Sequence, residues 1–191
     1  MTSVLDRIRR QARLDPRRLV LAEGDDERVV RAADRLSRGK LAEVTLVGAR
    51  ETVRATARRA EVALLGVHLQ DAADPAGIER TAAALRAARG DRLSAADTDR
   101  YARDPVFQAA ARVRDGMADC FVAGASRTTA DVLRAAIWLI GTTPGVATVS
   151  SFFLMVVPPS PAASAERVFL FADCGVVPDP TPAQLAEIGC L

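Results

Sequence analysis

The feature that most limits the fold of this chain is a repeating alternation between short apolar runs and segments with helical spacing. The run at 18–22 is bounded by polar residues, and the apolar residues of 29–36 then recur on one helix face. A strand-like run at 44–47 and a helix-like segment at 51–59 repeat the pattern. Continuous apolar strands alternating with helices favour a parallel sheet covered on both faces. We therefore predict an α/β fold, a three-layer α/β/α sandwich with a mainly parallel sheet.

The same pattern continues as far as residue 144, which we take as the end of an amino-terminal α/β domain covering 1–144. A short helix within 1–18 leads into the fold. The remaining predicted elements are one or two short strands in 62–69, a helix at 78–89, two helices in 94–115, a buried strand at 119–124 and a helix at 132–140.

After Gly145 the sequence changes character, and we expect the start of an incomplete second α/β subdomain, 145–191. Residues 146–157 form a long β-branched and aromatic run, and 167–172 would be its partner strand. A helix then opens at 182–188 with proline in its first turn.

Composition excludes several classes of protein. The chain has 191 residues, and its longest apolar runs, 135–140 and 152–157, are far shorter than the ~20 residues that cross a bilayer. The formal net charge is only +2, with both signs mixed along the chain, so we expect no membrane span and no nucleic-acid partner. Three widely spaced cysteines fit neither a disulfide framework nor a zinc site, which favours a reducing, cytoplasmic setting.

The most informative local motif is Gly124 to Asp131, between a predicted strand and a predicted helix. Small residues, the hydroxyls of Ser126, Thr128 and Thr129, and a helix amino terminus together suit an anion, because unpaired N–H groups and the helix dipole point there. Alternatively, a threonine is merely the N-cap and the aspartate favours the first turn. The spacing alone does not decide between the two interpretations.

Three arginines are candidates for holding an anionic group. Arg134 lies two turns beyond Arg127 and could lean back toward the same helix end, or it could simply pair with Asp131 at i, i+3. Arg86 and Arg89 precede Gly90 at a predicted helix end, where cations complement the helix dipole without any ligand.

The other reactive side chains have simpler interpretations. The acidic group 23–27 could hold a divalent cation, but Asp25 or Asp26 as a helix cap is the stronger account, and we predict no metal site. We expect His68, the single histidine, to be packed and hydrogen-bonded. Cys174 is expected to be a buried, inert thiol rather than a nucleophile.

With these residues in place, the sequence resembles the phosphate acetyl/butyryl transferase family, and within it the phosphate acetyltransferases. The resemblance covers almost the whole chain. Its signatures are the ordered motifs LAEGDDERVVRAA, LRAARG, DPVF, MADCFVAGASRTTADVLRAA, TPGVATVSSFFLM and FADCGVVPDPTPAQLAEI.

The resemblance implies reversible formation of acetyl-CoA and phosphate from acetyl phosphate and CoA, by direct attack of the CoA thiolate on the acyl carbonyl. CoA is then a substrate, and no other cofactor, metal or covalent intermediate is implied. In the family, an arginine matching Arg134 and one matching Arg86 contribute to CoA or phosphate binding, with Arg89 as a competitor for the second role. Ser126, Thr128 and Thr129 would line the cleft.

Two departures from the family pattern matter. Relatives usually carry histidine where this chain has Arg127, which adds a cation beside the expected anion site. Family members also continue beyond the last helix, and the serine, arginine and aspartate that perform the chemistry are expected beyond Leu191, so no catalytic residue is assigned here.

Three possibilities for the chain's role follow from that expectation. One is a phosphate acetyltransferase, or alternatively a phosphate butyryltransferase, that is inactive as this truncated chain. Another is a non-catalytic fragment that binds CoA or phosphate. The third is half of a split enzyme that pairs with a separate carboxyl-terminal half. A homodimer is a further expected partner.

Overall fold

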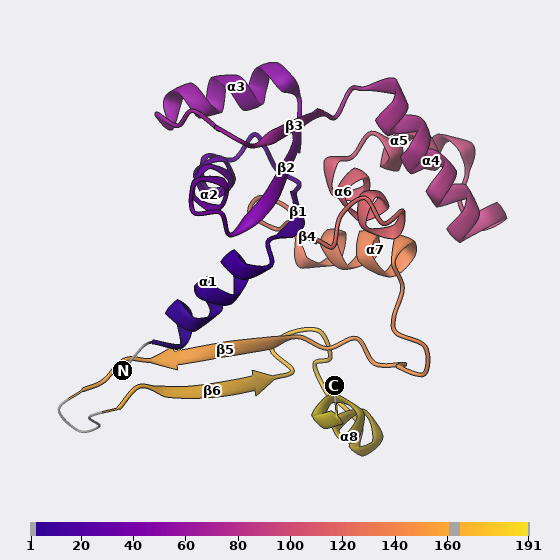
Figure 1. Cartoon of the computed structure of the whole chain (residues 1–191). Coiled ribbons are helices and arrows are strands. Elements are labelled where there is room, and N and C mark those ends of the chain that lie inside the picture. Colours follow the sequence, from indigo (N-terminus) through magenta and orange to yellow (C-terminus); the bar gives the residue numbers. More distant parts are fainter. Residues whose placement is uncertain (1–2, 161–164, 191) are drawn as a thin grey trace. The chain divides into compact units, whose positions relative to one another are not determined.

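A computed structural model describes residues 3–160 and 165–190 (Figure 1). Its contacts divide the chain into two compact units, residues 9–141 and residues 1–8 with 142–191. Each unit is described by itself.

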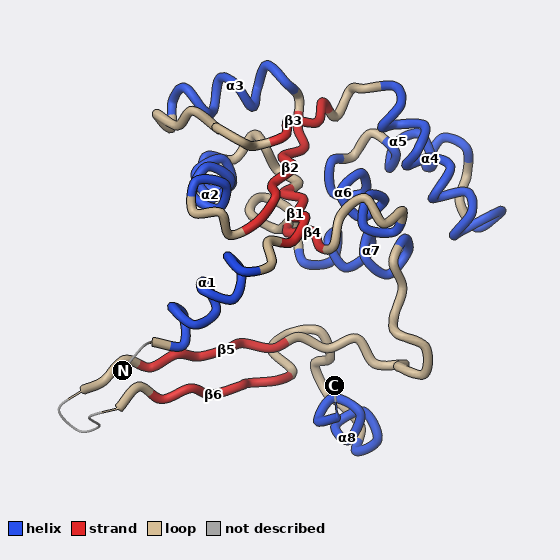
Figure 2. The backbone as a smooth tube through the Cα atoms, in the orientation of Figure 1, coloured by secondary structure: helices blue, strands red, loops and turns tan. Residues whose placement is uncertain are grey.

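The larger unit is built on a four-stranded parallel sheet, shown in red in Figure 2. The strands lie in the order β3-β2-β1-β4, and every neighbouring pair is parallel. Their bounds are β1 Arg17–Leu21, β2 Ala42–Gly48, β3 His68–Asp71 and β4 Cys120–Val122. The order places β1 between β2 and β4, which decides where the candidate site lies.

Helices cover both faces of this sheet, so the predicted three-layer α/β/α sandwich is confirmed (Figure 1). On one face are α2 Glu27–Arg38 and α3 Arg50–Arg59; on the other are α4 Pro75–Arg89, α5 Ala95–Ala102, α6 Pro105–Arg114 and α7 Thr129–Leu139, with a 3₁₀ turn at Gly90–Arg92. Alternate strand residues supply the two cores. Val20 packs in the α4–α7 core and Leu21 in the α2–α3 core, as the period of a strand requires.

Three details of the predicted domain were wrong. Residues 62–67 are irregular loop with a turn at 65–66, and β3 begins only at His68. His68 is exposed rather than packed, because it begins an edge strand. The strand at 119–124 shortens to β4 and is not buried. Val122 is 57% exposed, because β4 has a neighbour on one side only.

The smaller unit contains an antiparallel two-stranded ribbon and a helix. The ribbon is β5 Phe152–Val157 paired with β6 Arg167–Ala172, so the predicted strand at 146–157 begins later than expected. In α8, Pro182–Cys190, Glu187 accepts hydrogen bonds from the N–H groups of Ala147 (2.7 Å) and Thr148 (3.1 Å). That carboxylate fixes the helix to the segment before the ribbon.

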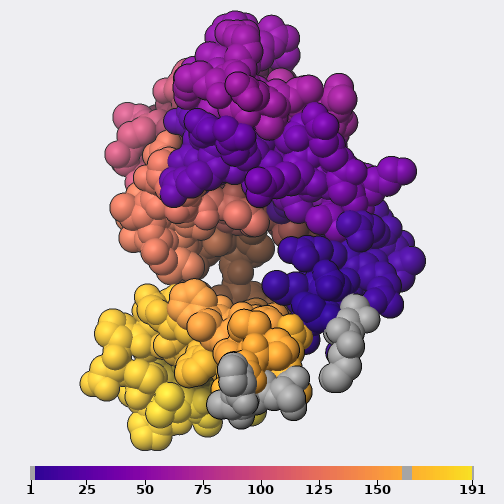
Figure 3. All heavy atoms as spheres, turned by 90° about the vertical axis from the view of Figure 1, so that its left-hand side faces the viewer, coloured from indigo at the N-terminus to yellow at the C-terminus, as the bar shows by residue number. Residues whose placement is uncertain are grey.

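The ribbon side chains are apolar and exposed on both faces. Orange spheres of the β5 region lie at the surface in Figure 3, and the exposed large residues are Phe152, Phe153, Leu154, Met155, Val168, Phe169, Leu170 and Phe171. An isolated two-stranded ribbon is only marginally stable in water. We therefore expect further protein surface to pack against these apolar side chains.

Two further features concern the chain's ends and environment. Helix α1, Val4–Leu14, confirms the expected leading helix, and the N–H of Val4 donates to the Glu166 carboxylate at 2.8 Å. In the described part of the chain, none of the helices has the length and apolar character needed to span a bilayer.

Candidate functional site

The strand order creates a crevice at the carboxyl ends of β1 and β4. These two strands are parallel neighbours, but the helices that follow them, α2 and α7, pack in the cores on opposite faces of the sheet. In open α/β sheets, such a switch of direction is where ligands bind. The segment after β1 and the loop after β4 therefore meet at the position most suited to a site.

In this crevice, the loop after β4 wraps around the carboxylate of Glu23. One carboxylate oxygen accepts from the N–H groups of Gly124 (2.6 Å) and Ala125 (2.9 Å). The other accepts from the N–H of Ser126 (2.7 Å), the hydroxyl of Ser126 (2.9 Å) and the N–H of Arg127 (2.8 Å). Five donors thus converge on one buried carboxylate.

Two glycines make this arrangement possible. A Cβ on Gly24 would come within 2.7 Å of a Val53 methyl carbon and 3.0 Å of the Val47 carbonyl oxygen, so only glycine lets the chain turn there. Gly124 has φ +103°, a left-handed conformation that other residues rarely adopt. The first glycine directs Glu23 over the end of β1, and the second curls the loop around it.

The environment of Glu23 holds it ionised. Burial raises the pKa of this carboxyl group, but the hydrogen bonds from the loop, led by the Ser126 N–H, bring the pKa below its ordinary value. Contrary to the expectation, the N–H groups of residues 124–127 are therefore not unpaired, because an internal carboxylate accepts from them. In the first turn of α7, the N–H groups of Thr129 and Ala130 make no hydrogen bond to a described residue, so the expectation holds there.

The acidic segment after β1 acts locally, as the capping interpretation predicts. Asp26 is the N-cap of α2 and accepts from the N–H of Arg28 at 2.8 Å. The Arg28 guanidinium also pairs with Asp26 at 2.7 Å and donates to the Ala125 carbonyl. The hydrogen bond from the Arg28 side chain is the main reason that the pKa of Asp26 falls to about 2. Arg28 thereby ties the acidic segment to the loop.

At the start of α7 the structure contains the N-cap and the i, i+3 ion pair that the sequence spacing allowed as alternatives to ligand binding. Thr128 is the N-cap, and its hydroxyl accepts from the Asp131 N–H at 3.2 Å and donates to the Asp131 carboxylate at 2.7 Å. Arg134 pairs with Asp131 at 2.8 Å. The Thr128 hydroxyl, and then Arg134, lower the pKa of Asp131. These contacts fix the Arg134 side chain over the first turn of the helix.

Arg134 and Arg127 line one open pocket of about 330 Å³, so the two arginines do share a helix end. The pocket walls come from α5, α6, α7 and the loop, and include Tyr101 and Asp104. Arg127 pairs with Asp104 at 3.1 Å. Thr129, by contrast, is exposed, and its hydroxyl makes no hydrogen bond to any described residue. Thr129 does not line this pocket, so within it the guanidinium groups of Arg127 and Arg134 are the donors that could bind a phosphate or pyrophosphate group.

Arg86 and Arg89 lie elsewhere on α4. Arg86 pairs with Glu79 at 2.5 Å and lines a different pocket of about 450 Å³. Arg89 lies over the Trp138 ring, 4.8 Å from its centroid. The structure therefore does not bring Arg86 into the pocket of Arg134, and Arg89 is engaged in packing.

Sequence reasoning missed Glu23 and Asp104 as site residues. Both residues lie in motifs described above, Glu23 in the acidic group 23–27 and Asp104 in DPVF. Their roles were missed because each contacts a segment that is distant in the sequence. The thiol of Cys174 is partly exposed rather than buried. Among the described residues no cluster of three metal-binding side chains occurs.

Comparison with known proteins adds what geometry alone does not give. Residues 3–190 match the family described as phosphate acetyl/butaryl transferase. The chain belongs to this family. It is 43% identical over 188 residues to a phosphate acetyltransferase of Paracoccus denitrificans, covering 96% of this chain and 54% of that protein. It is 35% identical over 180 residues to a phosphate acetyltransferase of Clostridium acetobutylicum, covering 93% and 53%.

Solved structures agree with the fold. A phosphotransacetylase from Streptococcus pyogenes superimposes with a TM-score of 0.85 at 30% identity, over 98% of this chain and 56% of that one. The chain therefore spans about half the length of each of these three relatives.

Proposed function

We propose that this chain supplies the amino-terminal part of a phosphate acetyltransferase site, which transfers acetyl between acetyl phosphate and CoA. The observation that carries the proposal is the match of residues 3–190 to the family, with relatives named phosphate acetyltransferase. Those names favour acetyl over butyryl as the transferred group. CoA acts as a substrate, and no further cofactor takes part.

In this proposal the pocket of Arg127 and Arg134 binds a phosphate-bearing part of the substrates. Arg134 is pre-positioned by Asp131, and Thr129 offers a free hydroxyl at the helix start. Ser126 and Thr128 act indirectly, because their hydroxyls already hold Glu23 and Asp131. Arg86 remains a candidate for a separate contact with CoA.

The chemical step needs more than this binding surface. The CoA sulfur attacks the acetyl carbonyl carbon, the bond from that carbon to phosphate oxygen breaks, and phosphate leaves with the electron pair. A base must take the thiol proton, and donors must stabilise the carbonyl oxygen. We propose that residues outside this sequence supply both, so the 191-residue chain does not turn over alone.

A carboxyl-terminal half, on a separate chain or as a continuation, is the partner we propose for the β5–β6 ribbon. The ribbon exposes apolar side chains on both faces, and the relatives contain about as much sequence again. A second copy of the chain is the competing occupant. The three cysteines are free thiols, which supports the cytoplasm as the compartment.

Equilibrium dialysis with CoA tests the binding role. Wild type should bind CoA, and Arg134→Ala should weaken binding about tenfold, as expected for one charge-assisted contact. Arg58→Gln is the control, since it removes an exposed arginine of α3 whose side chain makes no hydrogen bond or ion pair with a described residue. Equal affinities in wild type and Arg134→Ala would refute the assignment of Arg134.

A further inference from the structure

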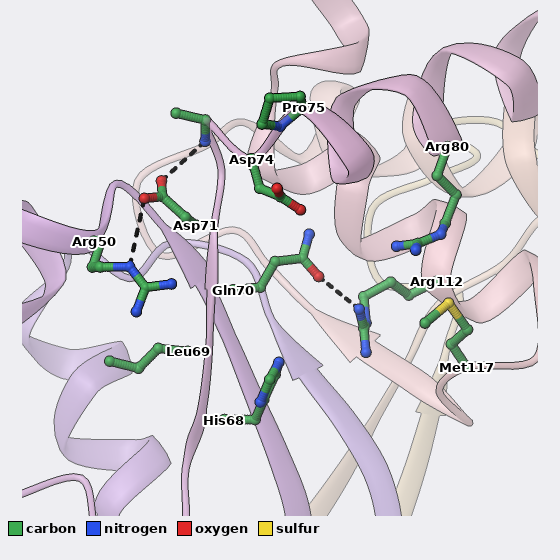
Figure 4. Close-up of a pocket in the computed structure, with 11 residues that line it drawn as sticks. Arg50, His68, Leu69, Gln70, Asp71, Asp74, Pro75, Arg80, Arg112 and Met117 are labelled. Atoms are coloured by element: carbon green, nitrogen blue, oxygen red, sulfur yellow. Dashed lines mark hydrogen bonds and ion pairs between the residues drawn. The ribbon is translucent and has the colours of Figure 1, made fainter.

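The edge of the sheet opposite to β4 carries a second concave surface. It is an open pocket of about 510 Å³ beside β3, lined by residues of β3, α4 and α6 (Figure 4). None of the residues that line it also lines the pocket of Arg127 and Arg134. It is separate from the candidate site.

Two arginines enter this pocket without a carboxylate partner. Figure 4 shows Arg80 of α4 and Arg112 of α6 side by side in the pocket, with the Arg112 guanidinium extending toward Gln70. Within the described chain, Arg80 makes no hydrogen bond or ion pair, and Arg112 makes no ion pair. Both are partly buried. Elsewhere in the unit, arginines such as Arg18, Arg28 and Arg103 are paired with aspartates.

Besides lacking an ion pair, the Arg112 guanidinium has an unsatisfied hydrogen-bond donor. One terminal nitrogen donates to the Gln70 amide oxygen at 2.7 Å, but its Nε is buried and has no hydrogen-bond partner. A buried donor without an acceptor is costly. Burial, and then the positive charge of Arg80, lower the pKa of Arg112. The two positive charges of Arg80 and Arg112 therefore repel each other in this pocket.

Neighbouring residues hold this arrangement rigid. The Gln70 amide donates to Gln108 at 3.1 Å, and the Gln108 amide donates to the carbonyls of Ala72 (2.9 Å) and Ala102 (3.0 Å). The Gln70 oxygen therefore faces Arg112 because its nitrogen is committed elsewhere. The site is fixed by buried amides rather than by flexible surface chains.

The pocket's two carboxylates are engaged with other groups. Asp71 pairs with Arg50 at 3.7 Å and accepts from the Ala73 N–H. Asp74 caps α4 by accepting from the Gly77 N–H at 3.2 Å. Three arginines face two aspartates, so the pocket keeps a positive excess.

We propose that this pocket binds a phosphate-sized oxyanion between Arg80 and Arg112, at a site distinct from the acetyl-transfer pocket. Such an anion would accept from both guanidinium groups and relieve their mutual repulsion. Bidentate geometry suits a phosphoryl group particularly well. Its source would be either free phosphate or the phosphoryl group of a larger molecule.

Thermal unfolding tests the proposal, because Trp138 is the single tryptophan and packs inside this unit against Tyr101 and Phe107. Its fluorescence is followed in a parent protein, in its Arg80→Gln variant and in the charge-matched control Arg58→Gln, with inorganic phosphate titrated at constant ionic strength. All three carry Arg134→Ala, so phosphate binding at the acetyl-transfer pocket does not contribute.

Phosphate should raise the midpoint of the control by about 3–6 °C for each tenfold increase above its dissociation constant. Arg80→Gln should need at least tenfold more phosphate for the same shift. Without phosphate, Arg80→Gln should melt higher than the control, because it relieves the repulsion. Equal phosphate responses in Arg80→Gln and the control would overturn the proposal.

A phosphomonoester, glycerol phosphate, is titrated in parallel. Tighter binding of the ester assigns the site to a phosphoryl group of a larger molecule, and tighter binding of phosphate assigns it to free phosphate. If neither ligand shifts the control, the pocket is not an oxyanion site, whatever the outcome for CoA binding.

Discussion

Glu23 and Ser126, 103 positions apart, are joined by two hydrogen bonds: the Glu23 carboxylate accepts from the Ser126 N–H at 2.7 Å and from its hydroxyl at 2.9 Å. This contact closes the crevice between β1 and β4. It orders the loop before α7, and with it the start of the helix that carries Thr129 and Arg134. The Glu23 carboxylate also occupies loop N–H groups that could otherwise bind an external anion.

Replacing Glu23 by glutamine should destabilise the larger unit by about 2–3 kcal/mol. The amide keeps one acceptor but turns an NH₂ group toward loop donors, which leaves buried N–H groups unsatisfied. Urea unfolding followed by Trp138 fluorescence measures the change. Glu51→Gln is the control, because the Glu51 side chain is 82% exposed and its loss should cost less than 0.5 kcal/mol. Equal stability of the two variants would contradict the role assigned to Glu23.

The stability difference between wild type and Glu23→Gln should depend on pH. The pKa of Glu23 is lower in the folded protein than its ordinary value of 4.5, so the unfolded chain takes up the proton first as pH falls. The contribution of Glu23 is therefore complete above about pH 5 and is lost progressively as pH falls toward the folded pKa. Urea unfolding of both proteins between pH 7 and pH 3 checks this, and a constant difference across the range would argue against it.

The two threonines at the start of α7 should separate stability from binding. Thr128→Val removes the cap and should cost about 1 kcal/mol, whereas Thr129→Val should change the free energy of unfolding by less than 0.5 kcal/mol. If Thr129 contacts the ligand, only its variant should weaken CoA binding at unchanged stability. If Thr129→Val lowered the stability and Thr128→Val did not, the assignment of Thr128 as the N-cap would be refuted.

The exposed β5–β6 ribbon should make the isolated chain self-associate. Leu170 is 65% exposed on the ribbon, and Leu170→Lys should shift the chain toward monomer, because it places a charge on an apolar strand face. Leu65→Lys is matched in exposure, at 65%, but lies outside the ribbon. Size-exclusion chromatography with light scattering measures the mass. A monomeric wild type, or the same response to both variants, would show that the ribbon does not drive association.

Local sequence signals predicted much of the fold. Gly39 ends α2, Pro182 lies in the first turn of α8, and Thr128 caps α7, all because these preferences act within a few residues. Pro75, which begins α4, was not used, and the predicted helix began three residues late. The alternation of strand and helix was enough to predict a parallel sheet with helices on both faces.

Long-range contacts could not be predicted in the same way. The apolar sequence of β4 indicated burial, but strand order made it an edge strand with Val122 exposed. Glu23 was read only with its acidic neighbours, because its partners lie more than 100 positions away. The pairing of Arg127 with Asp104 was likewise invisible until α6 and the loop were placed side by side.

The measurement that tests the central claim most directly is CoA-dependent release of phosphate from acetyl phosphate. It is made with the 191-residue chain alone, and again after refolding with the carboxyl-terminal half of the Paracoccus denitrificans relative, with Arg134→Ala in parallel. We predict no turnover by the chain alone, turnover with the added half, and loss of most of that turnover in Arg134→Ala. Turnover by the chain alone, or turnover with the added half that does not depend on Arg134, would contradict the account.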